Sequence, residues 1–160
     1  MIKRILIGFI LLGSILSWVV CASDLDGIIA DCNDCHGQDG LSTESDIPIL
    51  AGQSYLVLED ALLAYAANER VCKESDYRHG DTSRPATTMC KIAAGLGEDD
   101  IEALSEHYEG LSFIGVKQDF DSVLVKKGTA IHKRHCEKCH SEGGSIADDD
   151  AGLLAGQWTP

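Results

Sequence analysis

One short pattern of two cysteines and a histidine occurs twice in this chain, and it constrains the fold more than any other feature. The copies are CNDCH at residues 32–36 and CEKCH at residues 136–140, both of the form C-x-x-C-H. A shift of 104 residues places one copy on the other, and it also places LAGQ at residues 50–53 on LAGQ at residues 154–157. Seven identities at one offset, without a gap, indicate duplication of a unit of small-domain size.

The C-x-x-C-H spacing is typical of covalent haem attachment. Two thiols reach the two vinyl groups at one edge of the porphyrin, and the next residue brings an imidazole to the iron. We therefore expect two covalently bound haem c groups. The cysteines that attach them are Cys32, Cys35, Cys136 and Cys139, and the histidines that ligate the iron are His36 and His140. A zinc ribbon and a thioredoxin-like dithiol are the alternatives, although neither requires a histidine at that position.

The first residues have the layout of a secretory signal peptide. Lys3 and Arg4 precede an uncharged apolar run over residues 5–20, and small residues follow up to Ala22. The run is shorter than the ~20 residues that a spanning helix needs. A membrane anchor and a lipoprotein attached through Cys21 are the alternatives. We predict a signal peptide over residues 1–22 and a periplasmic protein that has no membrane attachment after cleavage.

The exported chain is strongly acidic. Its formal net charge of -13 becomes -15 after cleavage, because residues 1–22 contain two basic and no acidic residues. Such a surface repels nucleic acid and anionic lipid, and it favours partners with basic faces. The alternative is that the acidity serves solubility alone.

The periodicity of the apolar residues predicts an all-α fold. Two helices, over residues 24–32 and about 119–136, are expected to lead into the two motifs. Two more are expected within residues 53–70 and 97–110, where apolar side chains recur at helical spacing. Their apolar faces contain Leu58, Ala61, Leu62 and Tyr65 in the first, and Ile101, Leu104 and Tyr108 in the second. No alternating strand pattern competes with these helices.

These helices and motifs suggest two haem-binding domains. We place the first at residues 23–110, a linker at 111–120 and the second at 121–160. Met89, the one methionine left after cleavage, lies in an expected loop and is the candidate sixth ligand of the first iron. Its counterpart would fall at residue 193, so the second domain is expected to be truncated and to lack its native sixth ligand.

The remaining cysteines, Cys72 and Cys90, lie 18 residues apart and outside the haem motifs. In an oxidising compartment this pair predicts a disulfide that closes the segment leading to Met89. Two buried thiols are the alternative. The other histidines, His79, His107, His132 and His135, are expected on solvated surfaces.

The order of C-x-x-C-H, LAGQ, a methionine loop and a helix with an acidic start resembles tandem dihaem class I cytochromes c. The segments FDSVLVKKGTAIHKRHCEKCHSEGG and LLAGQWTP are most similar to the cytochrome subunit of flavocytochrome c sulfide dehydrogenase. The resemblance implies that the chain is an electron-transfer subunit, not itself an enzyme, that accepts electrons from a flavoprotein subunit oxidising sulfide. It assigns Met89 to the first haem.

Two alternatives to this function remain. One is a free-standing soluble carrier that serves a terminal oxidase, a reductase or other periplasmic redox proteins. The other, a dihaem peroxidase, is less expected because no acid–base constellation accompanies the motifs.

Overall fold

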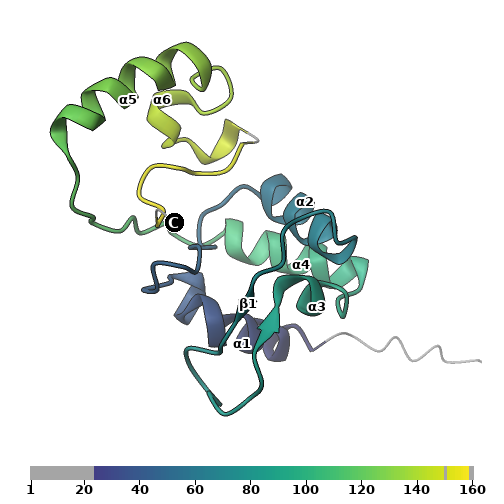
Figure 1. The fold of residues 1–160 in the computed structure, drawn as a ribbon. Helices are drawn as coiled ribbons and strands as arrows, with labels where there is room; N and C mark the ends of the chain where they lie inside the picture. The colour runs from purple at the N-terminus through teal and green to yellow at the C-terminus, as the bar shows by residue number, and fades with distance from the viewer. Residues whose placement is uncertain (1–23, 150, 159–160) are drawn as a thin grey trace, which may run out of the picture.

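The computed structural model describes residues 24–149 and 151–158 (Figure 1), so the predicted signal peptide lies outside the described residues. The elements are α1 (Leu25–His36), η1 (Gln38–Gly40), α2 (Tyr55–Ala66), β1 (Glu74–Ser75), β2 (Thr87–Thr88), α3 (Met89–Ala93), α4 (Glu98–Glu109), α5 (Ser122–His135), α6 (Ser141–Gly144) and η2 (Ala147–Asp149). The all-α prediction is confirmed, with one antiparallel pair of two-residue strands as an addition. Over the two described ranges, every helix is too short or too polar to cross a membrane.

Helix α1 carries the first C-x-x-C-H motif. It begins after Asp24, whose carboxylate accepts a hydrogen bond from the Gly27 amide at 3.2 Å. It continues four residues beyond the predicted end at residue 32 and stops at Gly37, whose φ of 77° suits glycine. The motif therefore lies within the helix, where side chains three and four residues apart share one face.

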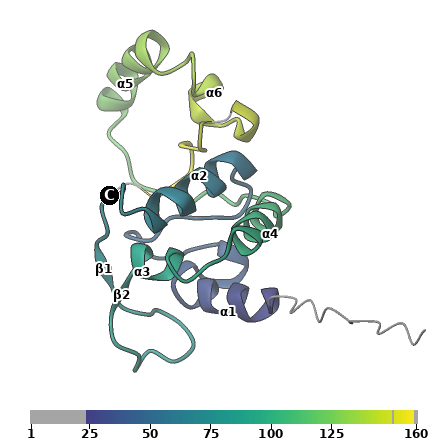
Figure 2. The ribbon, with the colours of Figure 1, turned by 90° about the vertical axis from the view of Figure 1, so that its right-hand side faces the viewer.

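The core of the first unit lies between α1, α2 and α4 (Figures 1 and 2). Leu58 of α2 contacts Leu104 and Tyr108 of α4, and all three are buried. The predicted apolar face of α4 is confirmed, since Ile101 is buried as well. On α2 Leu58 is buried, and the other predicted face residues are half-buried.

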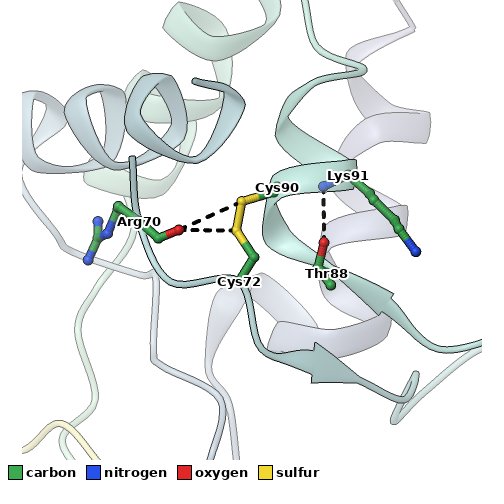
Figure 3. Close-up of a disulfide and its surroundings, with 5 residues drawn as sticks. All are labelled: Arg70, Cys72, Thr88, Cys90 and Lys91. Atoms are coloured by element: carbon green, nitrogen blue, oxygen red, sulfur yellow. Dashed lines mark hydrogen bonds between the residues drawn. A yellow bond between two sulfur atoms is a disulfide. The ribbon is translucent and has the colours of Figure 1, made fainter. Parts of the chain in front are cut away.

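A disulfide-closed insert joins α2 to α4 through α3. Strands β1 and β2 pair antiparallel, with Glu74 opposite Thr88, and residues 76–86 form a long loop beyond them (Figure 2). The predicted disulfide between Cys72 and Cys90 is confirmed (Figure 3). Both sulfur atoms lie near the Arg70 carbonyl oxygen, at 3.4 and 3.9 Å.

Helices α5 and α6 lie apart from this first group (Figure 1). Asp121 caps α5 by accepting from the amides of Val123 at 2.7 Å and Leu124 at 3.2 Å, and the helix ends close to the predicted limit. Within the described chain α5 has no buried residue, and the side chains of Val123 and Leu124 are 60% and 63% exposed. The second motif follows this helix in turns, whereas the first lies inside α1.

The last described residues return to the first unit, where Trp158 Nε1 donates to the Ser42 carbonyl at 3.0 Å. Backbone hydrogen bonds there recur at the offset found in the sequence. The Gly40 carbonyl accepts from the amides of residues 50 and 51 at 2.8 and 3.5 Å, and the Gly144 carbonyl accepts from those of residues 154 and 155 at 2.9 and 3.0 Å. This recurrence supports the interpretation of a duplicated unit.

Candidate functional site

His36, the histidine of the first motif, is buried and held in one orientation. Its Nδ1 lies 2.9 Å from the carbonyl oxygen of Pro48. Since a carbonyl only accepts, Nδ1 must carry the proton, which leaves the Nε2 lone pair for a metal. Burial lowers the pKa of His36, although the Pro48 carbonyl acts in the opposite direction. The ring is therefore the neutral imidazole that metal ligation requires.

Cys32 and Cys35 precede His36 on the same face of α1. Both are free thiols and half-buried. Burial raises the pKa of Cys32 to about 11, an increase opposed by its hydrogen bond with Tyr108, and burial also raises the pKa of Cys35. The site thus favours uncharged sulfur, which is also the state of a thioether. One buried imidazole and two thiols on one helix face fit a covalently attached haem.

The insert is held over this part of α1 by ion pairs. The Arg84 guanidinium binds the Asp31 carboxylate at 3.0 Å, pairs with Asp34, and lies 3.6 Å from the centre of the Tyr77 ring. The amides of Arg78 and the next residue each donate to the Asp34 carbonyl at 2.8 Å. These contacts lie beside Cys35, whose pKa both arginines act to lower. Sequence reasoning missed them, and the available signal was the pair of carboxylates beside the motif cysteines.

Met89 is half-buried and begins α3, so its expected position in a loop is wrong. Thr88 caps this short helix, its Oγ1 accepting from the Lys91 amide at 3.2 Å (Figure 3). The next residue, Cys90, is buried and fixed to Cys72 by the disulfide. The position of Met89 is thereby tied at both neighbours, while its ligation of the first iron stays a prediction.

In the described part of the chain, the second motif is more exposed than the first and is held by fewer contacts. Cys136 is half-buried, Cys139 is exposed, and both are free thiols. His140 Nδ1 is buried, and among the described residues it has no hydrogen-bond partner. At the offset of the repeat, the residue that corresponds to Pro48 is Gly152. The motif therefore has the residues for attachment, but its histidine lacks the hydrogen bond that orients His36.

The remaining histidines divide into two pairs. His79 and His135 are exposed, as expected. The surface prediction is wrong for the other two, which are half-buried. His107 packs edge-on against Tyr108 with ring centres 5.0 Å apart, and His132 pairs with Glu137 at 3.0 Å.

The zinc alternative gains no support from the geometry. A structural zinc site uses four ligands, usually cysteines and histidines. Over residues 24–149 and 151–158, no three or more histidine, cysteine or acidic side chains gather where they could hold a metal ion.

Comparison with known proteins points to one family, although no family model matches the chain. Cytochrome c-554(548) of Halomonas halodenitrificans is 32% identical over 80 residues, which make up 50% of this chain and 83% of that protein. Among solved structures, cytochrome c4 of Acidithiobacillus ferrooxidans is 26% identical with a TM-score of 0.61, and the match covers 81% of this chain and 74% of that one. Reduced recombinant cytochrome c4 from Pseudomonas stutzeri is 25% identical with a TM-score of 0.62, over 84% and 72%.

A third structural match is part of a larger redox enzyme. Thiosulfate dehydrogenase from Marichromatium purpuratum is 26% identical with a TM-score of 0.59, and the match covers 79% of this chain but 26% of that one. None of these four proteins is a flavocytochrome c sulfide dehydrogenase, so the closer resemblance to its cytochrome subunit stays a prediction.

Proposed function

This chain belongs to the cytochrome c family, and from that premise we propose that it is an exported, periplasmic dihaem protein that passes single electrons and catalyses no reaction of its own. The observation that carries the proposal is the state of His36. Its imidazole is buried and neutral, with Nδ1 held by the Pro48 carbonyl and Nε2 left for iron. His36 directly follows Cys35, and Cys32 lies one turn earlier on the same helix face.

At the first site, Cys32 and Cys35 attach the haem, and His36 and Met89 ligate its iron. When bound, the haem supplies reversible one-electron exchange between ferric and ferrous iron. The chain orients the imidazole and keeps it neutral, and a thioether sulfur as second ligand raises the reduction potential and closes the iron to small molecules.

At the second site, Cys136 and Cys139 attach the haem, and His140 ligates its iron. We place the two units at residues 23–110 and 121–160, joined by residues 111–120. Carbon monoxide titration tests the coordination of the second iron. Binding of about one carbon monoxide per chain would show that this iron has an open position, whereas two low-spin haems that bind none would show that a further group ligates it.

The partner we propose is a flavoprotein subunit that oxidises sulfide and donates electrons to this chain. The thiosulfate dehydrogenase likeness supports a redox enzyme as partner, and the acidic surface suits a basic docking face. Purification from native periplasm at low salt tests this proposal. Flavin that co-purifies with the chain supports the subunit, whereas a chain that elutes alone supports a free carrier to a terminal oxidase or reductase.

Electron transfer without catalysis is tested by two assays on the same preparation. Redox titration should give reversible visible spectra with one electron per haem. Addition of peroxide and an oxidisable dye should produce no turnover. Rapid dye oxidation, abolished when the second motif is removed by Cys136→Ala/Cys139→Ala, would instead establish the peroxidase alternative.

A further inference from the structure

The glutamines that end the two LAGQ segments join the two units by hydrogen bonds. Gln157 Oε1 accepts from the Ile49 amide at 3.0 Å, and its Nε2 donates to the Ile49 carbonyl at 2.8 Å. Gln53 Oε1 accepts from the Leu153 amide at 2.9 Å, and its Nε2 donates to the Leu153 carbonyl at 3.5 Å. Ile49 and Leu153 correspond at the offset of the repeat. Each glutamine therefore hydrogen-bonds to the backbone of the equivalent residue in the other unit.

Ile49, to which Gln157 bonds, directly follows Pro48, whose carbonyl orients His36. The carbonyl of Pro48 and the amide of Ile49 belong to one peptide group. That group accepts from His36 Nδ1 at its oxygen and donates to Gln157 at its nitrogen. A continuous hydrogen-bonded path therefore joins the His36 ring to a side chain of the other unit. Ile49 is 1% exposed and His36 is buried, and both hydrogen bonds of the path are partly buried.

We propose that Gln157 is a positioning residue for the first haem, lowering its reduction potential through the Pro48–Ile49 peptide group and His36. The inference rests on the proposed function in one respect, the ligation of the first iron by His36. It goes further by giving the second unit a part in setting the potential of the first.

The direction of the effect follows from the polarity of an amide. Donation from the Ile49 amide increases the negative charge on the Pro48 oxygen, because hydrogen bonds polarise one another along a chain. A stronger acceptor at Nδ1 makes the imidazole a more basic ligand. A more basic ligand stabilises ferric over ferrous iron, so loss of Gln157 raises the potential.

Gln53 provides a matched control within the same interface between the two units. The side chain of Gln53 hydrogen-bonds to the amide and the carbonyl of Leu153, and none of its described side-chain hydrogen bonds goes to the Pro48–Ile49 group. Substitution of either glutamine by methionine keeps the side-chain length and removes two hydrogen bonds. Both variants weaken the contact between the units, but only Gln157→Met interrupts the path to His36.

The experiment uses the full chain in a Cys136→Ala/Cys139→Ala background, where the first motif alone can carry haem. Redox titration gives one potential, and proton NMR follows the exchange of the His36 Nδ1 proton with solvent. Gln157→Met should raise the potential and accelerate this exchange, while Gln53→Met should leave both near the values of the unsubstituted background. Gln157→Asn, whose shorter amide cannot reach Ile49, should give the same changes as Gln157→Met. It replaces Gln157→Met as the test if the methionine variant does not incorporate haem.

Three results overturn the inference. An unchanged potential in haem-loaded Gln157 variants refutes the path. Equal shifts in the Gln157 and Gln53 variants indicate general opening of the interface. Intact mass without haem at residues 32–36 overturns the proposed function together with the inference, whereas the first two results leave the proposed function standing.

Discussion

Removal of the Cys72–Cys90 disulfide should destabilise the first unit substantially. The bridge closes a segment with a sequence separation of 18. Loop-closure entropy then gives a contribution of about 3 kcal/mol to the free energy of unfolding. For a unit of this size, that value corresponds to a fall in Tm of roughly 12–24 °C. Because Cys90 directly follows Met89, the Met89 sulfur should also dissociate from the first iron at a lower temperature than in the native protein.

The assay compares the native chain with Cys72→Ala/Cys90→Ala, with iron in the same oxidation state in both. Circular dichroism reports helix melting, and the weak near-infrared band of iron bound by sulfur reports Met89. A dithiol should lower the Tm of the native chain and leave that of the variant unchanged, since thioether bonds resist such reductants. Equal Tm values for the two proteins would refute the loop-entropy reasoning, and a near-infrared band that outlasts the helices would refute the link to Met89.

Four further results are expected. Met89→Ala should shift the first haem toward high spin, lower its potential and remove the near-infrared band, and an unchanged spectrum would mean that another residue ligates the iron. Because burial lowers the pKa of His36 from 6.5, protonation should compete with iron binding only at lower pH. An acid titration that loses the ligand at or above pH 6.5 would contradict the buried neutral ring. Arg84→Gln should free the insert from α1 and accelerate chymotryptic cleavage after Tyr77, which the native ion pairs and ring contact protect; equal cleavage rates would count against this role. Association with a basic partner should slow as salt rises, since the screening length falls to about 8 Å at physiological ionic strength, and a rate independent of salt would assign the acidity to solubility alone.

The sequence predicted those parts of the fold that depend on local signals. Helices α2, α4 and α5 were predictable from apolar periodicity and end residues, and all three lie close to the expected positions. The disulfide was predictable because the haem motifs account for four of the six cysteines after residue 22. The end of α1 was not, because the polar motif residues obscure the periodicity and Gly37 sets the limit through its conformation.

Long-range contacts were beyond sequence reasoning. Helix α3 has five residues, too few for a periodic pattern, and it depends on Thr88 and the disulfide. The LAGQ repeat was visible, but its role in joining the two units depends on hydrogen bonds between residues 100 and 108 positions apart. The ion pairs of Arg84 likewise join residues 50 and 53 positions apart.

Intact-mass spectrometry of the protein purified from periplasm tests the haem content most directly. The mass should equal that of the chain cleaved after Ala22 plus two haem groups, and both should remain attached in denaturant. Cys32→Ala/Cys35→Ala should leave one haem, held at the second motif. A mass without haem, or haem that dissociates on denaturation, would contradict the assignment of this chain as a dihaem electron-transfer protein.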